Sequence, residues 1–276
     1  MTLANDPIVI VSAVRTPMGG LQGDLKSLTA PQLGAAAIRA AVERAGIAHD
    51  AVDEVLFGCV LPAGLGQAPA RQAALGAGLD KHTTCTTLNK MCGSGMQAAI
   101  MAHDLLLAGS ADVVVAGGME SMTNAPYLLK KHRSGARLGH DTAYDHMFLD
   151  GLEDAYEPGR AMGTFAQETA NAYQMTREEM DAYSIESLAR ANRAIASGAF
   201  ADEVVPVTVS TRAGDVVVEH DEAPGKGRPD KIPQLKPAFA KDGTITAATS
   251  SSISDGAAAV VLARKSDAEA KGLAPV

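Results

Sequence analysis

Hydrophobic and polar positions divide most of this chain into short apolar runs and longer amphipathic ones. The short runs, rich in β-branched residues, predict strands at 7–14, 52–60, 83–88, 112–116 and 255–263. The longer runs have helical periodicity and predict helices at 30–44, 67–75, 96–108 and 267–271. Strands and helices alternate, which is typical of an α/β fold with a doubly wound sheet and helices on both faces. Ligands of such sheets gather at the strand ends.

The pattern changes in the middle of the chain. There it predicts helices at 162–174 and 177–197, short strands at 203–209 and 216–220, and a loop at 221–236. Two helix starts carry local signals, because Thr29 precedes the helix at 30–44 and Thr176 opens a capping box. We therefore expect one domain made of 1–120 and 251–276, with an inserted domain over 121–250.

Composition and charge narrow the class of protein. Of 276 residues, 46% are apolar and 20% charged, which are ordinary globular values. The net charge of −8 disfavours nucleic-acid partners and anionic membranes. We find no apolar run long enough for a signal peptide or a membrane span. Three cysteines fit a reducing compartment, and the scattered histidines predict no metal site. The expectation is a cytoplasmic protein.

One stretch stands out as a candidate site. The string NKMCGSGMQAA at 89–99 joins the strand at 83–88 to the helix at 96–108. Cys92 therefore falls at a strand-to-helix turn, where unpaired N–H groups and the positive helix end favour a thiolate. Glycines on either side of Ser94 let the backbone turn sharply. A free cysteine is more often a small buried hydrophobe than a nucleophile. The turn position favours a nucleophile, and both interpretations stay open at this point.

That string, followed by GGMESMTNAPY at 117–127, resembles the thiolase family, and acetyl-CoA acetyltransferases in particular. The resemblance implies a mixed five-stranded sheet with helices on both faces and an inserted α/β loop domain for coenzyme A and tetramer contacts. It implies that a cysteine becomes acylated and that a second acetyl-CoA forms or releases the C–C bond. Acetyl-CoA and 3-ketoacyl-CoA would be substrates, with no separate cofactor, and the protein would be a homo-oligomer, a tetramer by resemblance. The polar, basic loop at 130–137 would contact other subunits.

Several residues match the family's functional positions. Cys92 matches the nucleophile, and its own backbone N–H matches one oxyanion donor. Six residues match contacts to coenzyme A: Leu152, Met162, Phe239, Ala247, Ser251 and Ile253. The chain also departs from the family, with Ala161 at a usual histidine and Gly225 at a usual arginine near the nucleotide. A nearby lysine offers a point charge where arginine offers a fork, so the pose of the nucleotide would differ.

Other parts of the family's machinery have no match here. The Asn-Glu-Ala-Phe string, the Gly-His-Pro string and the late cysteine do not occur, so the resemblance covers the N-terminal portion of a thiolase, without the C-terminal thiolase domain. We expect no turnover by these residues alone, because losing an activating base costs orders of magnitude in rate. Two alternatives stay open: a ketoacyl-synthase-like condensing enzyme, and a catalytically silent subunit for coenzyme A binding or assembly. Acyl length and reaction direction also stay open.

Overall fold

The computed structural model describes residues 6–276, and its largest element is a mixed β-sheet. The strand order is β1-β10-β5-β3-β4, and the short β2 (Gly19–Gly20) pairs with β10. β3 is parallel to β4 and β5, whereas β10 is antiparallel to β1 and β5. The bounds of the five long strands are β1 Ile8–Arg15, β3 Glu54–Gly58, β4 Thr84–Leu88, β5 Val113–Ser121 and β10 Ser254–Arg264. The predicted mixed α/β sheet is confirmed.

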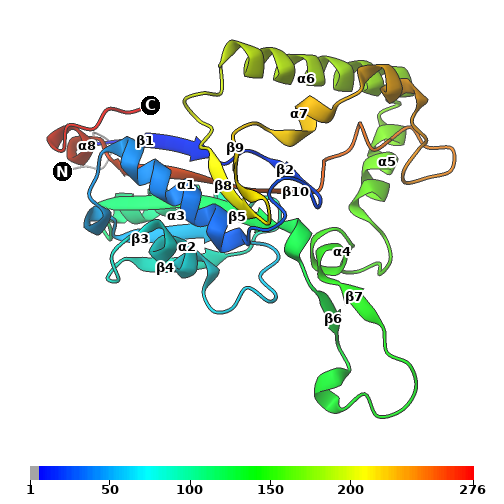
Figure 1. The fold of residues 1–276 in the computed structure, drawn as a ribbon, viewed down its shortest axis with the longest axis horizontal. Coiled ribbons are helices and arrows are strands. Elements are labelled where there is room, and N and C mark those ends of the chain that lie inside the picture. Colours follow the sequence, from blue (N-terminus) through cyan, green and yellow to red (C-terminus); the bar gives the residue numbers. More distant parts are fainter. Residues whose placement is uncertain (1–5) are drawn as a thin grey trace. The chain divides into compact units, whose positions relative to one another are not determined.

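Helices cover both faces of this sheet. α1 (Ala30–Ala45) and α2 (Pro69–Ala77) lie side by side over one face (Figure 1), and α3 (Ser94–Ala108) packs on the other. Successive strand residues point to opposite faces, so Phe57 joins the core beneath α1 and α2 while Leu56 joins the core beneath α3. Burial on both faces explains why β3 and β5 read as nearly continuous apolar runs, whereas the edge strand β4 has three threonines.

The helix ends follow the local signals in the sequence. Thr29 caps α1 through a complete capping box, and Gly46 ends that helix in the left-handed conformation, with φ of 68°. Thr176 caps α6 (Arg177–Ser197) in the same way. Each cap satisfies backbone N–H groups that a helix start leaves without partners. Both predicted starts are confirmed.

The chain forms two compact units. The first comprises the chain through Asn124, Ala201–His220 and Ser254–Val276, and the second comprises Ala125–Phe200 and Asp221–Ile253. The sequence grouped 201–220 with the insertion, whereas the hairpin of β8 (Val207–Thr211) and β9 (Gly214–Val218) belongs to the first unit. The reason is packing, because Val207 and Val209 are buried in the core that α1 and α2 cover.

The remaining elements are short. The first unit also contains η2 (His49–Ala51), η3 (Met122–Asn124) and α8 (Lys265–Ala270). The second unit contains, besides α6, a ribbon of two strands, three helices and two 3₁₀ turns. These are β6 Tyr127–Leu129, η4 His132–Ser134, β7 Ala143–Asp145, α4 His146–Gly151, α5 Met162–Ala172, α7 Glu222–Lys226 and η5 Pro229–Gln234. None of the helices among residues 6–276 is long and apolar enough to cross a membrane.

The prediction of a loop over 221–236 was wrong in part, because α7 and η5 form there. Lys226 pairs with Glu222 one turn earlier, which supports α7. Ile232 is buried, and the carbonyls of Ile232 and Leu235 accept hydrogen bonds from the guanidinium of Arg177. These partners lie far along the chain, so the composition of the segment did not reveal them.

The bounds of several predicted strands shift, and for two of them the structure shows the reason. The strand expected at 203–209 begins at Val207, because the preceding segment bonds to β1 instead. Arg15 donates its N–H to the Glu203 carbonyl and accepts from the Val205 N–H. The strand expected at 112–116 continues to Ser121, because β10 supplies hydrogen-bonding partners along its whole length. The glycines at 117 and 118 therefore lie inside β5, not beyond its end.

Candidate active site

Cys92 lies on the turn between β4 and α3, and its side chain is exposed at an open hollow of about 320 Å³. Four separate parts of the first unit reach this hollow: the end of β1, the end of β3, the second half of β5 and the start of β10. Polar side chains in its wall include Arg15, Ser94, Glu120 and Asp255. The hollow thus brings the candidate nucleophile together with charged groups distant in sequence.

Glycines allow the start of α3 to approach the sheet this closely. A Cβ on Gly58, the last residue of β3, would lie 2.6 Å from the Cβ of Ser94 and 2.9 Å from its carbonyl carbon. A Cβ on Gly118 of β5 would lie 3.7 Å from the Cα of Gly95. The turn carrying Cys92 is therefore seated against β3 and β5, and Gly118 lines the same hollow.

Side chains hold the turn in a conformation that is unusual for residues with a Cβ. Met91 has φ of 50°, in the left-handed region. The Ser94 hydroxyl donates to the Met91 carbonyl at 2.6 Å and accepts from the Lys90 N–H at 2.8 Å. The Asn89 Oδ1 accepts from the Met91 N–H at 2.9 Å. These hydrogen bonds fix the turn that holds Cys92. Cys92 lies two residues before the first residue of α3, near the positive end of the helix.

The backbone N–H of Cys92 points to a role in binding an anion. Among residues 6–276 it has no hydrogen-bond acceptor. An unpaired donor at a helix start is suited to an oxyanion, because its N–H is already oriented and needs no rearrangement. The sulfur and the donor belong to the same residue, which fixes their spacing.

Two carboxylates flank the hollow, and the sequence assigned neither a role. Glu120 accepts the N–H groups of Val60 at 2.8 Å and Leu61 at 3.0 Å. Asp255 is buried, and its Oδ1 accepts the Thr123 N–H at 3.0 Å, while its Oδ2 has no partner in the described part of the chain. Glu120 stood inside the string that carried the family resemblance, but nothing local indicated that it would reach the end of β3.

The other two cysteines differ from Cys92 in their surroundings. Burial, with a further contribution from the Glu120 carboxylate, raises the pKa of the Cys59 thiol to about 12. Burial likewise raises the pKa of Cys85. Both effects keep these thiols protonated at neutral pH. Of the three cysteines, Cys92 has the exposed side chain.

Within the described residues, the titratable side chains of this wall are two carboxylates, one guanidinium and the Cys92 thiol. None of the described residues lining the hollow is a histidine. Within 6–276, no group of three or more His, Cys, Asp or Glu side chains is arranged to hold a metal ion. In the part of the chain that the structure describes, the hollow therefore supplies the sulfur and the unpaired backbone N–H of Cys92, together with the carboxylates of Glu120 and Asp255.

The residues expected to contact coenzyme A all lie in the second unit. Met162 begins α5 and donates its N–H to the Leu152 carbonyl at 2.8 Å. The ring of Phe239 lies against Gly163, where a Cβ would come within 2.2 Å of two ring atoms. Three of the six expected residues thus meet at the first turn of α5.

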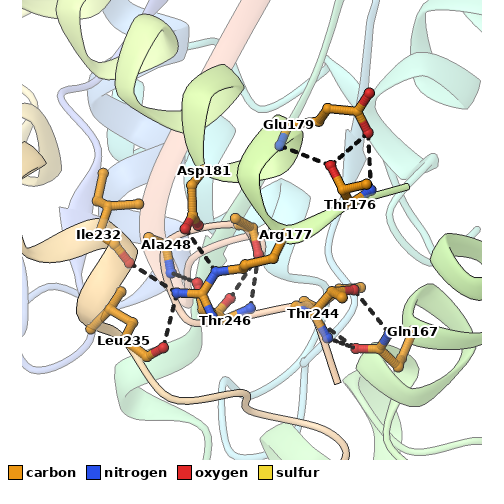
Figure 2. A network of polar contacts seen from close by, with 12 residues as sticks. Gln167, Thr176, Arg177, Glu179, Asp181, Ile232, Leu235, Thr244, Thr246 and Ala248 are labelled. Atoms are coloured by element: carbon orange, nitrogen blue, oxygen red, sulfur yellow. Dashed lines mark hydrogen bonds and ion pairs between the residues drawn. The ribbon is translucent and has the colours of Figure 1, made fainter. Parts of the chain in front are cut away.

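Gln167, on the next turn of α5, ties a further segment to this place (Figure 2). Its Oε1 accepts the N–H groups of Thr244 at 2.9 Å and Ile245 at 3.0 Å. The segment continues through Ala247 and Ser251, which are exposed, to the half-buried Ile253. Gln167 is 5% exposed, and no sequence pattern indicated its role because its hydrogen-bonding partners are far along the chain.

A second anchor lies at the start of α6 (Figure 2). Arg177 pairs with Asp181 at 2.7 Å and donates to the carbonyls of Ile232 at 3.1 Å and Leu235 at 2.9 Å. It thereby fixes the segment that leads toward Phe239. One guanidinium can bind several oxygens at once because its donors form a rigid fork.

The chain is similar to known proteins along most of its length. The family described as thiolase, N-terminal domain, matches residues 8–266. A probable acetyl-CoA acetyltransferase of Dictyostelium discoideum is 46% identical over 272 residues, covering 98% of this chain and 66% of that protein. Acetyl-CoA acetyltransferase 1 of Arabidopsis thaliana is 50% identical over 258 residues, covering 92% of this chain and 62% of that protein.

A solved structure shares the fold. The crystal structure of Acat5 thiolase from Ascaris suum in complex with coenzyme A superposes with a TM-score of 0.91 and 42% identity, covering 98% of this chain and 69% of that one. The present chain thus spans about two thirds of the length of these relatives.

Proposed function

The chain belongs to the thiolase N-terminal domain family, and on that premise we propose that it carries the nucleophile of an acetyl-CoA acetyltransferase, with Cys92 as that nucleophile. The observation that supports this most is the exposed Cys92 sulfur beside its own unpaired N–H at the start of α3. The names of the relatives favour an acetyltransferase over a ketoacyl-synthase-like enzyme. The reaction is the formation or cleavage of 3-ketoacyl-CoA.

The proposed half-reaction is an acyl transfer. The Cys92 thiolate attacks the carbonyl carbon of acetyl-CoA, and the new S–C bond forms as the electron pair moves to the carbonyl oxygen. The Cys92 N–H donates a hydrogen bond to that oxyanion. When the carbonyl re-forms, the bond to coenzyme A breaks, and coenzyme A leaves as a thiolate that takes up the proton lost by Cys92.

Turnover needs a base that activates the Cys92 thiol and a group that moves an α-proton, and we assign neither role to the Glu120 or Asp255 carboxylate. A second acetyl-CoA must lose an α-proton before it attacks the acyl-cysteine, and no histidine lines the hollow within the described residues. We therefore propose that this chain, assayed by itself, acylates slowly and does not turn over. Cleavage of acetoacetyl-CoA by the purified chain, dependent on coenzyme A, would refute this.

Coenzyme A is proposed to bind along the cluster at the first turns of α5. Leu152, Met162 and Phe239 supply apolar contacts, and the exposed Ser251 supplies a hydroxyl, with Ala247 and Ile253 beside it in sequence. Two features support the assignment: the short backbone link between Leu152 and Met162, and the anchoring of the 244–251 segment by Gln167.

The loop at 130–137, together with the strands β6 and β7 that flank it and the adjoining Leu138, is proposed as a subunit contact of a homotetramer. Its apolar side chains are exposed, with Tyr127 at 68% and Leu138 at 99%, and such groups favour a protein partner. Leu138→Asp is expected to shift the oligomer to smaller species in light scattering, and an unchanged mass would contradict the assignment. A cytoplasmic location is proposed from cysteine usage.

Acylation tests the central proposal directly. The chain is incubated with acetyl-CoA, digested and analysed by mass spectrometry, and we expect one acetyl group on Cys92. Cys92→Ala serves as the blank, and Cys85→Ala serves as the matched cysteine control, which should acylate like the parent. Acetylation spread equally over the cysteines, or none at Cys92, would overturn the proposal. Binding of coenzyme A without acylation would favour a silent binding subunit.

A further inference from the structure

The turn that carries Cys92 requires support from outside itself. Met91 adopts a left-handed φ of 50°, which a side chain with a Cβ disfavours. Such backbone conformations persist when surrounding contacts over-determine them. The bonds made by Asn89 and Ser94 hold the two sides of Met91, since Asn89 accepts from its N–H and Ser94 donates to its carbonyl. Ser94 belongs to α3 itself, whereas Asn89 must be held from elsewhere.

The support for Asn89 comes from the end of β3. Its Nδ2 donates to the Val60 carbonyl at 3.4 Å, a long hydrogen bond. The Val60 N–H in turn donates to Glu120 at 2.8 Å, and the Leu61 N–H donates to the other Glu120 oxygen at 3.0 Å. Val60 is therefore bound on both sides, by Glu120 and by Asn89. The contacts form a continuous chain from β5 through Val60 and Asn89 to Met91.

Glu120 suits this place because a carboxylate is purely an acceptor. Its two oxygens can receive two N–H groups, whereas a glutamine would offer one oxygen and turn an NH₂ group toward the second donor. Hydrogen bonds to a carboxylate are also stronger than neutral ones. Glu120 and Val60 both line the hollow at Cys92, so the chain of contacts lies in the site and not in a remote part of the fold.

We propose that Asn89 and Glu120 are positioning residues that hold the Met91–Cys92 turn so that the Cys92 sulfur faces an incoming thioester. This role rests on the proposed function, since it assigns a purpose to the same nucleophile. Asn89 acts through the Met91 N–H, and Glu120 acts through Val60 on Asn89. Neither side chain reacts with the substrate.

The experiment measures the rate at which iodoacetamide alkylates Cys92, by peptide mass spectrometry on the full 276-residue chain, with Cys85 in the same sample as internal reference. Asn89→Ala loses both contacts, and we expect the Cys92 rate to fall about two- to fivefold, the range that a charge near a helix end supports. Asn89→Asp keeps the acceptor for the Met91 N–H but loses the donor to the Val60 carbonyl and adds a negative charge near the sulfur, so Cys92 should react more slowly than in the parent. Glu120→Gln should lower it, by less than Asn89→Ala.

Asn124→Ala is the matched control. Asn124 also bridges backbone carbonyls within the first unit, those of Lys26 and Leu28, but it does not line the hollow. Its loss should leave the Cys92 rate unchanged. An unchanged rate in Asn89→Ala, or an equal fall in Asn124→Ala, would overturn the proposal. Should Asn89→Ala fail to fold, Glu120→Gln decides: a slower Cys92 supports the role and an unchanged rate refutes it.

The alkylation and acetylation experiments distinguish a failure of the positioning role from a failure of the proposed function. If Cys92 takes no acetyl group from acetyl-CoA while the alkylation rates follow the expected order, the acyl-transfer proposal fails and the positioning role stands. If Cys92 is acetylated but Asn89→Ala and Glu120→Gln react like the parent, the positioning role fails and the acyl-transfer proposal stands.

Discussion

The close approach of α3 to β3 gives a sharp test of how the fold positions Cys92. Gly58 is buried at the end of β3, and a Cβ added there meets the stem of Ser94, with two atoms nearer than 3.0 Å. One of these is the Ser94 backbone carbon, which cannot move without moving the start of α3. Gly58→Ala therefore pushes on the turn that carries Cys92 while changing the chemistry of no polar group.

The loss of folding stability caused by Gly58→Ala follows from this geometry. Overpacking a well-packed site costs about 1–3 kcal/mol, and contact with backbone puts Gly58→Ala near the upper end. Replacing glycine by alanine also restricts the unfolded chain, which returns roughly 0.4–1 kcal/mol. The expected net loss is about 2 kcal/mol, or about 3–4 °C in the midpoint of thermal unfolding for a protein of this size.

Differential scanning calorimetry and the alkylation rate of Cys92 measure the two consequences. Gly225→Ala is the matched control, because a Cβ at Gly225 meets nothing within 4 Å. We expect Gly58→Ala to lower both the midpoint and the Cys92 rate, and Gly225→Ala to leave both at or above the parent values. A Gly58→Ala chain with parental stability and parental Cys92 reactivity would refute the argument that this contact seats the turn.

Three further predictions concern other parts of the chain. Because burial raises the pKa of Cys59 to about 12, that thiol should stay protonated and unmodified by iodoacetamide at pH 8 while Cys92 reacts; equal modification would contradict the assignment. Thr29→Ala removes the α1 capping box and should lower the free energy of unfolding by about 1 kcal/mol, measured by urea titration followed by circular dichroism. An unchanged urea midpoint would show that the cap does not stabilise the protein. Gly163→Ala would displace the Phe239 ring, and losing roughly 1 kcal/mol of apolar contact should weaken coenzyme A binding about fivefold in calorimetric titration; an unchanged Kd would remove Phe239 from the binding surface.

Predictions from the sequence were most accurate where the determining interactions are local. The capping boxes of α1 and α6 span three residues, so Thr29 and Thr176 marked both helix starts without reference to the rest of the molecule. The position of Cys92 between a strand and a helix was equally local. The composition of 221–236 pointed to a loop, and it failed because α7 and η5 depend on Arg177 and on the burial of Ile232.

The amino-acid sequence by itself determined the alternation of strands and helices, the caps, and the candidate nucleophile with its family. Only the tertiary structure decided the neighbours of that nucleophile. Glu120 reaches Val60 because β5 pairs with β3, and Gln167 reaches Thr244 because two distant segments pack together. The physical reason is that hydrogen bonds act over about 3 Å. A residue's role can be predicted from sequence when its partner is a few positions away. When the partner is distant in sequence, only the folded structure shows which residue it is.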